Sequence, residues 1–319
     1  MKTIGVLTSG GDAPGMNAAI RAVVRTAINL GMNVKGIKRG YNGLIEGDII
    51  DLNARSVSDI INRGGTMLYT ARSPIFHTPE GIAAAVENCK KFGIEGIAVI
   101  GGDGTFRGAR DLSNSGIPCV GIPGTIDNDI SSSDYTIGYD TAMNTALEMV
   151  DRIRDTAQSH DRCSVIEVMG RHAGYIAVNV GIAVGATDIL IPEVETKTED
   201  VIKRIETARA NGKNHFIIVV AEGVGGVEKL AKNIQEATGI DSRATVLGHV
   251  QRGGNPTVLD RVRATQMGNA AVHLLANDIG NRVVSYKGSR IVDFDIFEAL
   301  QMKKEIAFDK LQVARECSI

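Results

Sequence analysis

The residues best suited to chemistry lie in one short stretch, Pro123-Gly124-Thr125-Ile126-Asp127-Asn128-Asp129. It follows the apolar run 117–122, which is short and bounded by Gly and Pro and therefore predicts a buried strand. Two carboxylates two residues apart, with the Thr125 hydroxyl two residues before the first, offer a proton acceptor, a positioning group and a cation ligand. Because Asp, Asn, Gly and Pro are also common turn formers, a plain turn is the alternative for this stretch taken alone.

A glycine-rich loop follows the first predicted strand, residues 3–8. The loop, Ser9-Gly10-Gly11-Asp12-Ala13-Pro14-Gly15, leads into a predicted helix whose free N–H groups and positive end suit a phosphate. Met16 and Asn17 stand where a Walker A loop has Lys and Ser/Thr, and GxGxxG is absent. The loop alone is therefore a weak signal for a nucleotide.

A second glycine loop, Gly101-Gly102-Asp103-Gly104-Thr105, ends the predicted strand 96–100. A helix to about residue 113 and the strand 117–122 follow, and this alternation predicts a parallel sheet with helices on both faces. Right-handed crossovers place the loops that follow parallel strands at one sheet edge. We therefore expect three loops to converge on one cleft, bringing together Gly11, Asp103 and Asp127.

A long helix predicted from residue 139 opens a second alternating run. Its strands are predicted at 163–169, 216–221 and 244–248, with helices that include 173–183 and 198–210. This repeat predicts a second, smaller α/β domain. The weaker expectations are a turn at 39–43, helical character around 56–62, and irregular packing after a helix at 258–275.

The composition describes an ordinary globular chain of 319 residues, with 43% apolar and 23% charged residues and a net charge of −2. No run of Lys or Arg indicates nucleic-acid binding, and no apolar stretch approaches the roughly 20 residues of a membrane span. The amino terminus lacks the apolar region of a signal peptide. Four scattered cysteines form no CxxC pair, which indicates a reducing cytoplasm without disulfides or structural zinc.

The polar residues at predicted strand ends are those of phosphoryl transfer. Asp103 and Asp129 can share a Mg²⁺ ion carried by a nucleotide. Arg72 and Arg171 can neutralise charge on a transferring phosphoryl group, and Asp127 can accept a hydroxyl proton. Zinc hydrolysis and serine nucleophile chemistry are not indicated, because HExxH and GxSxG are absent.

With these residues in place, the chain resembles the bacterial ATP-dependent 6-phosphofructokinases over essentially its whole length. Six motifs in order carry the resemblance: LTSGGDAPGMNAAIR (7–21), GGDGT (101–105), PGTIDND (123–129), MGRHAG (169–174), AEGVG (221–225) and GHVQRGG (248–254). It implies transfer of the ATP γ-phosphoryl to the 1-hydroxyl of fructose 6-phosphate in the cytoplasm, with ATP as co-substrate and Mg²⁺ as cofactor.

The resemblance also implies two Rossmann-like α/β domains, with mostly parallel sheets flanked by helices and the active site in the cleft between them. The expected ATP-binding domain is 1–138 plus 251–305, and the sugar-phosphate domain is 139–250 plus 306–319. The implied catalytic residues are Asp127, Thr125, Arg171 and Arg72, with Asp103 and Asp129 as metal ligands. The ATP-binding residues are Gly11, Tyr41, Arg72, Ser73, Gly102, Asp103, Gly104, Thr105 and Gly108. The substrate-binding residues are Thr125, Ile126, Asp127, Arg162, Met169, Gly170, Arg171, Glu222, Arg243, His249, Val250, Gln251 and Arg252.

In this family Arg162 and Arg243 match residues that reach the 6-phosphate from a neighbouring subunit, which implies a homotetramer with shared active and effector sites. Arg21 and Arg25, four residues apart on a helix, would alone indicate a solvated face or a shared anion, and the resemblance favours the anion. The implied pocket for ADP or phosphoenolpyruvate comprises Arg21, Ala22, Val23, Val24, Arg25, Asp59, Arg154, Gly185, Ala186, Thr187, Asn211, Lys213, Asn214 and His215. Relatives often carry Glu where this chain has Thr187, and Arg where it has Asn211. We therefore expect weakened allosteric control by ADP and phosphoenolpyruvate.

Two glycines bear on the phosphoryl donor. Pyrophosphate-using relatives typically have Asp at the position of Gly104 and Lys at that of Gly124, so glycine at both favours ATP. Two alternatives stay open: a pyrophosphate-dependent or other sugar-phosphate kinase of the same fold, and a nucleotide sensor without catalysis.

Overall fold

The computed structural model describes residues 1–318 and divides the chain into two compact units. Unit 1 comprises Met1–Thr141 and Arg252–Lys304, and unit 2 comprises Ala142–Gln251 with the chain from Glu305 onward. These boundaries differ by one to three residues from the expected ones. The first differs because Thr141 is tied to unit 1, where its backbone N–H donates to the Asp260 carboxylate at 2.9 Å.

The sheet of unit 1 has seven strands in the order β11-β10-β5-β4-β1-β2-β3. The inner five are parallel, and β3 and β11 pair antiparallel at the edges. The chain turns in opposite directions from the neighbouring strands β1 and β4, and such a switch point is where open α/β sheets bind ligands. The strands are β1 (Thr3–Ser9), β2 (Asn33–Ile37), β3 (Ile49–Leu52), β4 (Gly96–Gly101), β5 (Cys119–Pro123), β10 (Arg282–Lys287) and β11 (Arg290–Asp295).

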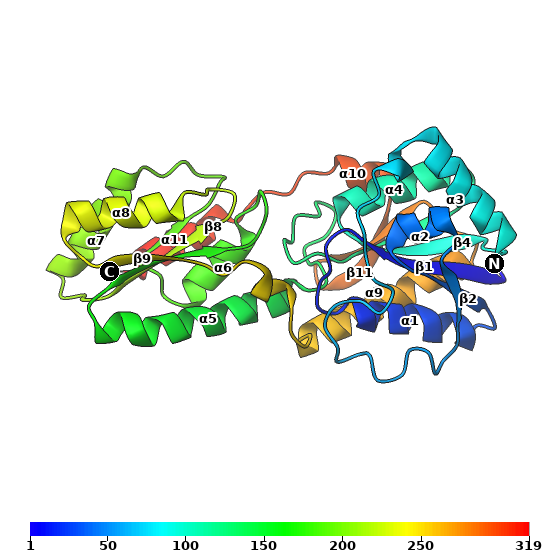
Figure 1. Cartoon of the computed structure of the whole chain (residues 1–319), viewed down its shortest axis with the longest axis horizontal. Coiled ribbons are helices and arrows are strands. Elements are labelled where there is room, and N and C mark those ends of the chain that lie inside the picture. The colour runs from blue at the N-terminus through cyan, green and yellow to red at the C-terminus, as the bar shows by residue number, and fades with distance from the viewer. Residues whose placement is uncertain (319) are drawn as a thin grey trace. The chain divides into compact units, whose positions relative to one another are not determined.

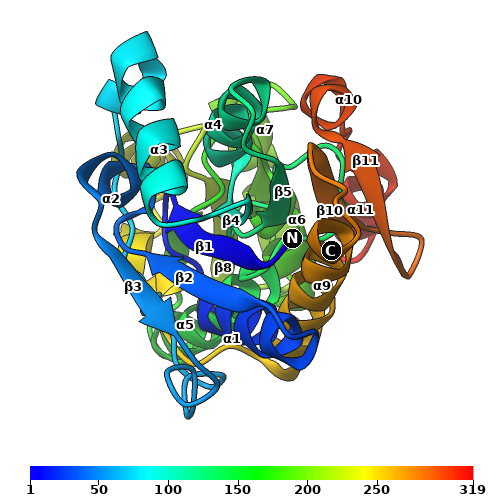
Figure 2. The same cartoon turned by 90° about the vertical axis from the view of Figure 1, so that its right-hand side faces the viewer.

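Helices cover both faces of this sheet. One face carries α1 (Met16–Asn29) and α9 (Val258–Ala276), which pack side by side (Figures 1 and 2). The other face carries α2 (Gly40–Glu46), α3 (Pro79–Lys91), α4 (Asp103–Asn114) and α10 (Ile296–Gln301), with a 3₁₀ turn at Ile75–His77. A buried apolar cluster joins these helices to the sheet and includes Leu7, Ile37, Leu44, Phe76, Phe106 and Leu112.

Unit 2 is a smaller sheet of four parallel strands in the order β7-β8-β6-β9. The strands are β6 (Cys163–Val168), β7 (Asp188–Leu190), β8 (Phe216–Ala221) and β9 (Ser242–Val246). α7 (Thr198–Ala210) and α8 (Val227–Thr238) bury an apolar cluster against one face, and α6 (Tyr175–Ala183) packs with α11 (Phe308–Glu316). The long helix α5 (Tyr139–Ser159) begins in unit 1 and continues into unit 2, and a 3₁₀ segment spans Gly248–Arg252.

The main strands and helices agree with the periodicity of the sequence, and three expectations were wrong. The expected turn at 39–43 is the start of α2. Residues 56–62 form turns because the Asn53 side chain accepts hydrogen bonds from the Arg55 and Ser56 N–H groups, which competes with a helix. The expected irregular tail contains the β10–β11 hairpin, whose Gly288 and Ser289 both have positive φ, as a type I′ turn requires.

Within residues 1–318, no helix is both long and apolar enough to cross a bilayer.

Candidate active site and effector residues

Three loops of unit 1 meet at one edge of the sheet, as the sequence predicts. They follow β1, β4 and β5, which are adjacent and parallel. The Gly124 N–H donates to the Gly101 carbonyl at 2.9 Å, and the Thr105 hydroxyl donates to the Ser9 carbonyl at 3.0 Å. Each loop is therefore hydrogen bonded to its neighbour, which fixes all three together.

The glycine loop after β1 is closely packed on both sides. Gly15 precedes α1 with φ of 106°, and a Cβ there would lie 2.7 Å from the Ile137 side chain. A Cβ on Gly11 would lie 2.3 Å from Nη1 of Arg252, which donates to the Asp12 carbonyl at 3.3 Å. Arg252, expected to bind the sugar phosphate, therefore lies against the loop expected to bind ATP.

Asn17 is a site residue whose role the sequence did not reveal. Its side chain is 3% exposed, and Nδ2 donates to the carbonyls of Arg63 and Gly64, both at 3.1 Å. Its Oδ1 accepts from the Met67 N–H at 2.7 Å. Asn17 thus anchors the segment that leads to Arg72, whose side chain is exposed.

Two residues expected to bind ATP, Tyr41 and Gly108, are buried and pack against each other. The Tyr41 ring stacks on Phe76 with centroids 4.0 Å apart, and its hydroxyl donates to the Thr105 carbonyl at 2.6 Å. A Cβ on Gly108 would lie 2.6 Å from the Tyr41 ring, so Gly108 gives that ring its room. Burial raises the pKa of Tyr41 well above its usual value. Tyr41 therefore holds the start of α4, and its part in ATP binding stays a prediction.

Asp103 and Gly104 lie at the open amino-terminal end of α4. A Cβ on Gly104 would meet nothing within 4 Å. The Asp103 carboxylate is 40% exposed and pairs with the Arg107 guanidinium at 2.9 Å, one helical turn later. Asp103 is thus accessible to a cation, but that cation would compete with Arg107.

The loop after β5 holds Asp127 largely out of solvent, at 6% exposure. The Thr125 hydroxyl lies 3.3 Å from both the Asp127 carboxylate and the Asp127 backbone nitrogen. Asn128 then adopts φ of 52°, a left-handed conformation that Asn tolerates well. Thr125 therefore positions the carboxylate, as the spacing of the two residues predicts.

A buried carboxylate from α9 supports this loop from behind. Asp260 is fully buried and accepts four hydrogen bonds, from the Tyr135 hydroxyl (2.5 Å), the Gly138 N–H (2.6 Å), and the N–H (2.9 Å) and hydroxyl (2.5 Å) of Thr141. The segment that Asp260 fixes contacts residues 123–129, which we expect to be catalytic and call the catalytic loop below. The contact is the hydrogen bond from the Thr136 hydroxyl to the Thr125 carbonyl, at 2.6 Å. Burial raises the pKa of Asp260, and these hydrogen bonds oppose the rise.

In unit 2 the expected substrate-binding residues gather at the ends of β6 and β8. The Glu222 carboxylate accepts hydrogen bonds from the N–H groups of Gly170 and Arg171. Gly170 has φ of 144° and Arg171 φ of 57°, so this turn is held in an uncommon conformation by Glu222. The Met169 N–H donates at 2.8 Å to the side chain of Gln251, which is fully buried, whereas His249 and Val250 are exposed.

Arg162 and Arg243, expected to act together on a phosphate, share one counter-ion in unit 2. Arg162 Nε donates to the Asp241 carboxylate at 2.6 Å, and Arg243 Nη2 lies 3.4 Å from the same oxygen. These hydrogen bonds lower the pKa of Asp241. Asp241 could not be predicted from the sequence, because a single acidic residue has no pattern that separates an ion-paired side chain from a solvated one.

The expected effector residues fall into two sets of cations, one in each unit. In unit 1, burial and Arg25 lower the pKa of Arg21. In unit 2, burial and then the charges of Arg154 and Lys213 lower the pKa of His215. Burial is the larger cause of both shifts and neighbouring like charge the smaller one, and a bound anion would offset the contribution of like charge.

The other expected effector residues range from buried to exposed. Ala22, Val23 and Val24 lie in the core on α1, and Ala186 and Thr187 are each 3% exposed. Lys213 Nζ donates to the Ser318 carbonyl at 3.2 Å. Asp59, Gly185, Asn211 and Asn214 are exposed.

Comparison with known proteins agrees with this geometry. The phosphofructokinase family model matches residues 3–275. The chain is 58% identical over 319 residues to proteins named ATP-dependent 6-phosphofructokinase from Bacillus thuringiensis and Bacillus anthracis, and all of each chain is covered.

Solved structures give the same result. A phosphofructokinase from Saccharomyces cerevisiae superposes with a TM-score of 0.89 at 34% identity, covering 100% of this chain and 48% of the yeast chain. A pyrophosphate-dependent phosphofructokinase from Marinobacter aquaeolei has a TM-score of 0.85 at 22% identity, covering 98% of this chain and 91% of its own, and shares the fold. With two parallel α/β sheets, converging loops and full-length similarity, the chain belongs to the phosphofructokinase family.

Proposed function

We propose that this chain is an ATP-dependent 6-phosphofructokinase, which transfers the ATP γ-phosphoryl to the 1-hydroxyl of fructose 6-phosphate in glycolysis. The single observation that carries the proposal is the buried Asp127 carboxylate beside Thr125, at the edge where three loops meet. A carboxylate held in this way is a suitable acceptor for the proton of the attacking hydroxyl. General-base catalysis of this kind contributes roughly 10²–10⁴ in rate.

Mg²⁺ would enter with the nucleotide. Among residues 1–318 no group of three or more His, Cys, Asp or Glu side chains could hold a metal ion. Magnesium on a nucleotide needs only one or two carboxylates, because phosphates and water supply its other ligands. The exposed Asp103 and the half-buried Asp129 fit that requirement, and the ion would neutralise charge on the phosphates. Arg72 and Arg171 are the side chains we assign to charge that develops on the transferred group.

Two glycines support ATP as the donor. The space around Gly104 is open at the exposed start of α4, as a nucleotide would require. A Cβ on Gly124 would lie 3.0 Å from the Ile100 side chain and 3.3 Å from that of Met16. A lysine at position 124 would require these two side chains to shift by a few tenths of an ångström, so the packing favours glycine over the lysine of pyrophosphate-using relatives.

We propose further that the enzyme is a cytoplasmic homotetramer with shared active and effector sites, and that its response to ADP and phosphoenolpyruvate is weakened. Thr187 has no carboxylate and its side chain is 3% exposed, so it offers a ligand's metal less charge than the Glu that relatives often carry there. The neighbouring Asp188 cannot replace it freely, because its carboxylate pairs with Arg204. Among the expected effector residues of unit 2, Arg154, Lys213 and His215 are then the groups that would bind an anion.

The test is formation of fructose 1,6-bisphosphate with Mg²⁺ and either ATP or pyrophosphate, repeated across ADP and phosphoenolpyruvate. We expect turnover with ATP that the effectors barely change. Turnover with pyrophosphate alone would contradict the assignment of the donor, and no turnover with either would favour a nucleotide sensor. Strong effector control at low micromolar concentrations would contradict the weakened pocket.

A further inference from the structure

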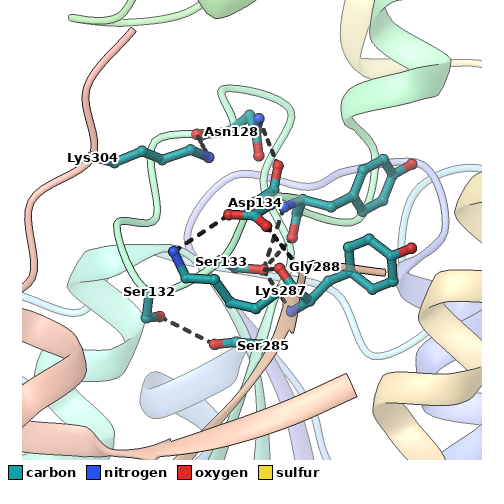
Figure 3. A network of polar contacts seen from close by, with 10 residues as sticks. Asn128, Ser132, Ser133, Asp134, Ser285, Lys287, Gly288 and Lys304 are labelled. Carbon is teal, nitrogen blue, oxygen red and sulfur yellow. Dashed lines mark hydrogen bonds and ion pairs between the residues drawn. The ribbon is translucent and has the colours of Figure 1, made fainter. Parts of the chain in front are cut away.

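One lysine contacts the backbone of the catalytic loop from a distant part of the chain. Lys304 Nζ donates to the Asn128 carbonyl at 2.8 Å (Figure 3). Asn128 lies between Asp127 and Asp129, is 5% exposed and has φ of 52°. The orientation of this one peptide therefore affects both carboxylates, the expected base before it and the expected metal ligand after it.

Lys304 is partly buried, which should strengthen its hydrogen bond to the Asn128 carbonyl. Burial lowers the pKa of Lys304 to about 8, although the nearby charges of Asp134 and Asp129 oppose the shift and Lys287 adds to it. A partly desolvated ammonium gains more from a carbonyl partner than an exposed one does. Replacing it with an apolar side chain would leave the Asn128 carbonyl without this donor.

The far end of the same loop is held by a different element. The Asp134 N–H donates to the Tyr286 carbonyl at 2.8 Å, and the Tyr286 N–H donates to the Ser133 hydroxyl at 2.9 Å. The Gly288 N–H donates to the Asp134 carboxylate at 3.1 Å, which also pairs with Lys287 (Figure 3). Because the β10–β11 hairpin fixes residues 133–134 without Lys304, removing the lysine should disturb mainly the Asn128 end.

Lys304 lies where the chain passes from unit 1 to unit 2. It is the last residue of unit 1, three residues beyond the end of α10, and the chain enters unit 2 at Glu305. The residue that fixes the catalytic loop is thus the one at which the chain leaves the unit.

We propose that Lys304 is a positioning residue for phosphoryl transfer, whose ammonium fixes the Asn128 peptide and thereby orients the carboxylates of Asp127 and Asp129. This inference rests on the proposed function. It predicts that loss of the ammonium lowers kcat, while fructose 6-phosphate still binds.

The experiment compares Lys304→Met, which removes the donor, with Lys304→Arg, which keeps a cationic donor, and with the control Lys303→Met at the exposed neighbouring lysine. Full-length variants are assayed for kcat, for KM of both substrates and for the Mg²⁺ concentration at half-maximal rate. We expect Lys304→Met to lose about 10- to 100-fold in kcat with KM for fructose 6-phosphate changed less than about threefold. Lys304→Arg should recover most of the loss, and Lys303→Met should behave as the wild type.

The inference is overturned if Lys304→Met keeps its kcat, if a rise in KM accounts for the loss, or if Lys304→Arg is as impaired as Lys304→Met. Thermal unfolding of each variant identifies a loss of fold, and Lys304→Gln, with the same criteria, replaces Lys304→Met if the latter does not fold. A wild-type chain that is inactive with ATP would refute the proposed function itself. An active wild type with an unaffected Lys304→Met would refute only the role of Lys304.

Discussion

The catalytic loop and the effector residues are built in opposite ways. Asp127 is buried in a loop whose ends are fixed by Thr136, Lys304 and the β10–β11 hairpin, so its geometry is set before any ligand binds. The cations of the effector set, such as Arg154 and Lys213, are partly exposed. Burial and then Arg154 lower the pKa of Lys213, and burial followed by Arg154 and Lys213 lowers the pKa of His215. Catalysis should therefore depend on rigid positioning, and effector binding on relief of like-charge repulsion.

The first test of this contrast between the two regions concerns Gly104, whose surroundings at the start of α4 are open. Gly104→Asp should fold normally, since a Cβ there meets nothing within 4 Å. Its carboxylate should repel the phosphates of ATP and raise KM for ATP at least tenfold, which corresponds to about 1.4 kcal/mol. Steady-state kinetics with varied ATP check this, with thermal unfolding as the control. An unchanged KM would show that ATP phosphates do not approach position 104.

A second test removes the buried support of the catalytic loop. Each Asp260 oxygen accepts from a backbone N–H, of Gly138 or Thr141, so Asp260→Asn places an amide N–H₂ against a group that cannot accept and should destabilise the fold by about 1–3 kcal/mol. Displacement of Thr136 and Thr125 should also lower kcat, by up to about 10²-fold. Asp278→Asn, at a carboxylate with 77% exposure, is the matched control. Denaturant unfolding and kcat check the prediction, and equal behaviour of the two variants would contradict it.

The third test concerns the cations around His215 in unit 2, Arg154 and Lys213. Burial, Arg154 and Lys213 lower the pKa of His215, so an anion bound among these groups should raise it again. Protonation then accompanies binding, and anion affinity should increase as the pH falls from the pKa of the bound state to that of the unliganded ring, which lies below the usual value of 6.5. An NMR titration of the His215 ring with and without inorganic phosphate checks the sign. The exposed His77 serves as reference, and a His215 pKa that phosphate leaves unchanged would contradict the account.

The smallest expected effect is at Asp103. Arg107→Ala releases this carboxylate from its ion pair, which should lower the Mg²⁺ concentration at half-maximal rate. Exposed pairs contribute about 0–1 kcal/mol, so the change should not exceed about fivefold. Arg152→Ala breaks a comparable pair with Glu148 and is the control. A higher Mg²⁺ requirement in Arg107→Ala would argue against Asp103 as a ligand.

The local parts of this site could be predicted from the sequence, and its long-range contacts could not. Apolar runs followed by glycine or Asp-rich loops indicated β1, β4 and β5, and parallel crossovers placed their loops together. The Thr125–Asp127 contact followed from spacing alone.

Contacts between distant segments left no such pattern. Lys304 and Asn128 are 176 residues apart, and Asp260 binds groups 119 to 125 residues earlier. A single lysine or aspartate looks the same in a sequence whether it is solvated or buried against a loop. The Gly288-Ser289 turn of the β10–β11 hairpin is a local signal, whereas the pairing of β10 with β5 joins distant segments and has no such signal.

The most direct test of the central claim compares the wild-type chain with Asp127→Ser, measuring both turnover with MgATP and binding of fructose 6-phosphate. The account predicts that turnover falls by roughly 10²–10⁴ while the sugar phosphate still binds with little change. Near-normal turnover in Asp127→Ser would remove Asp127 from the mechanism and contradict the role assigned to the converging loops.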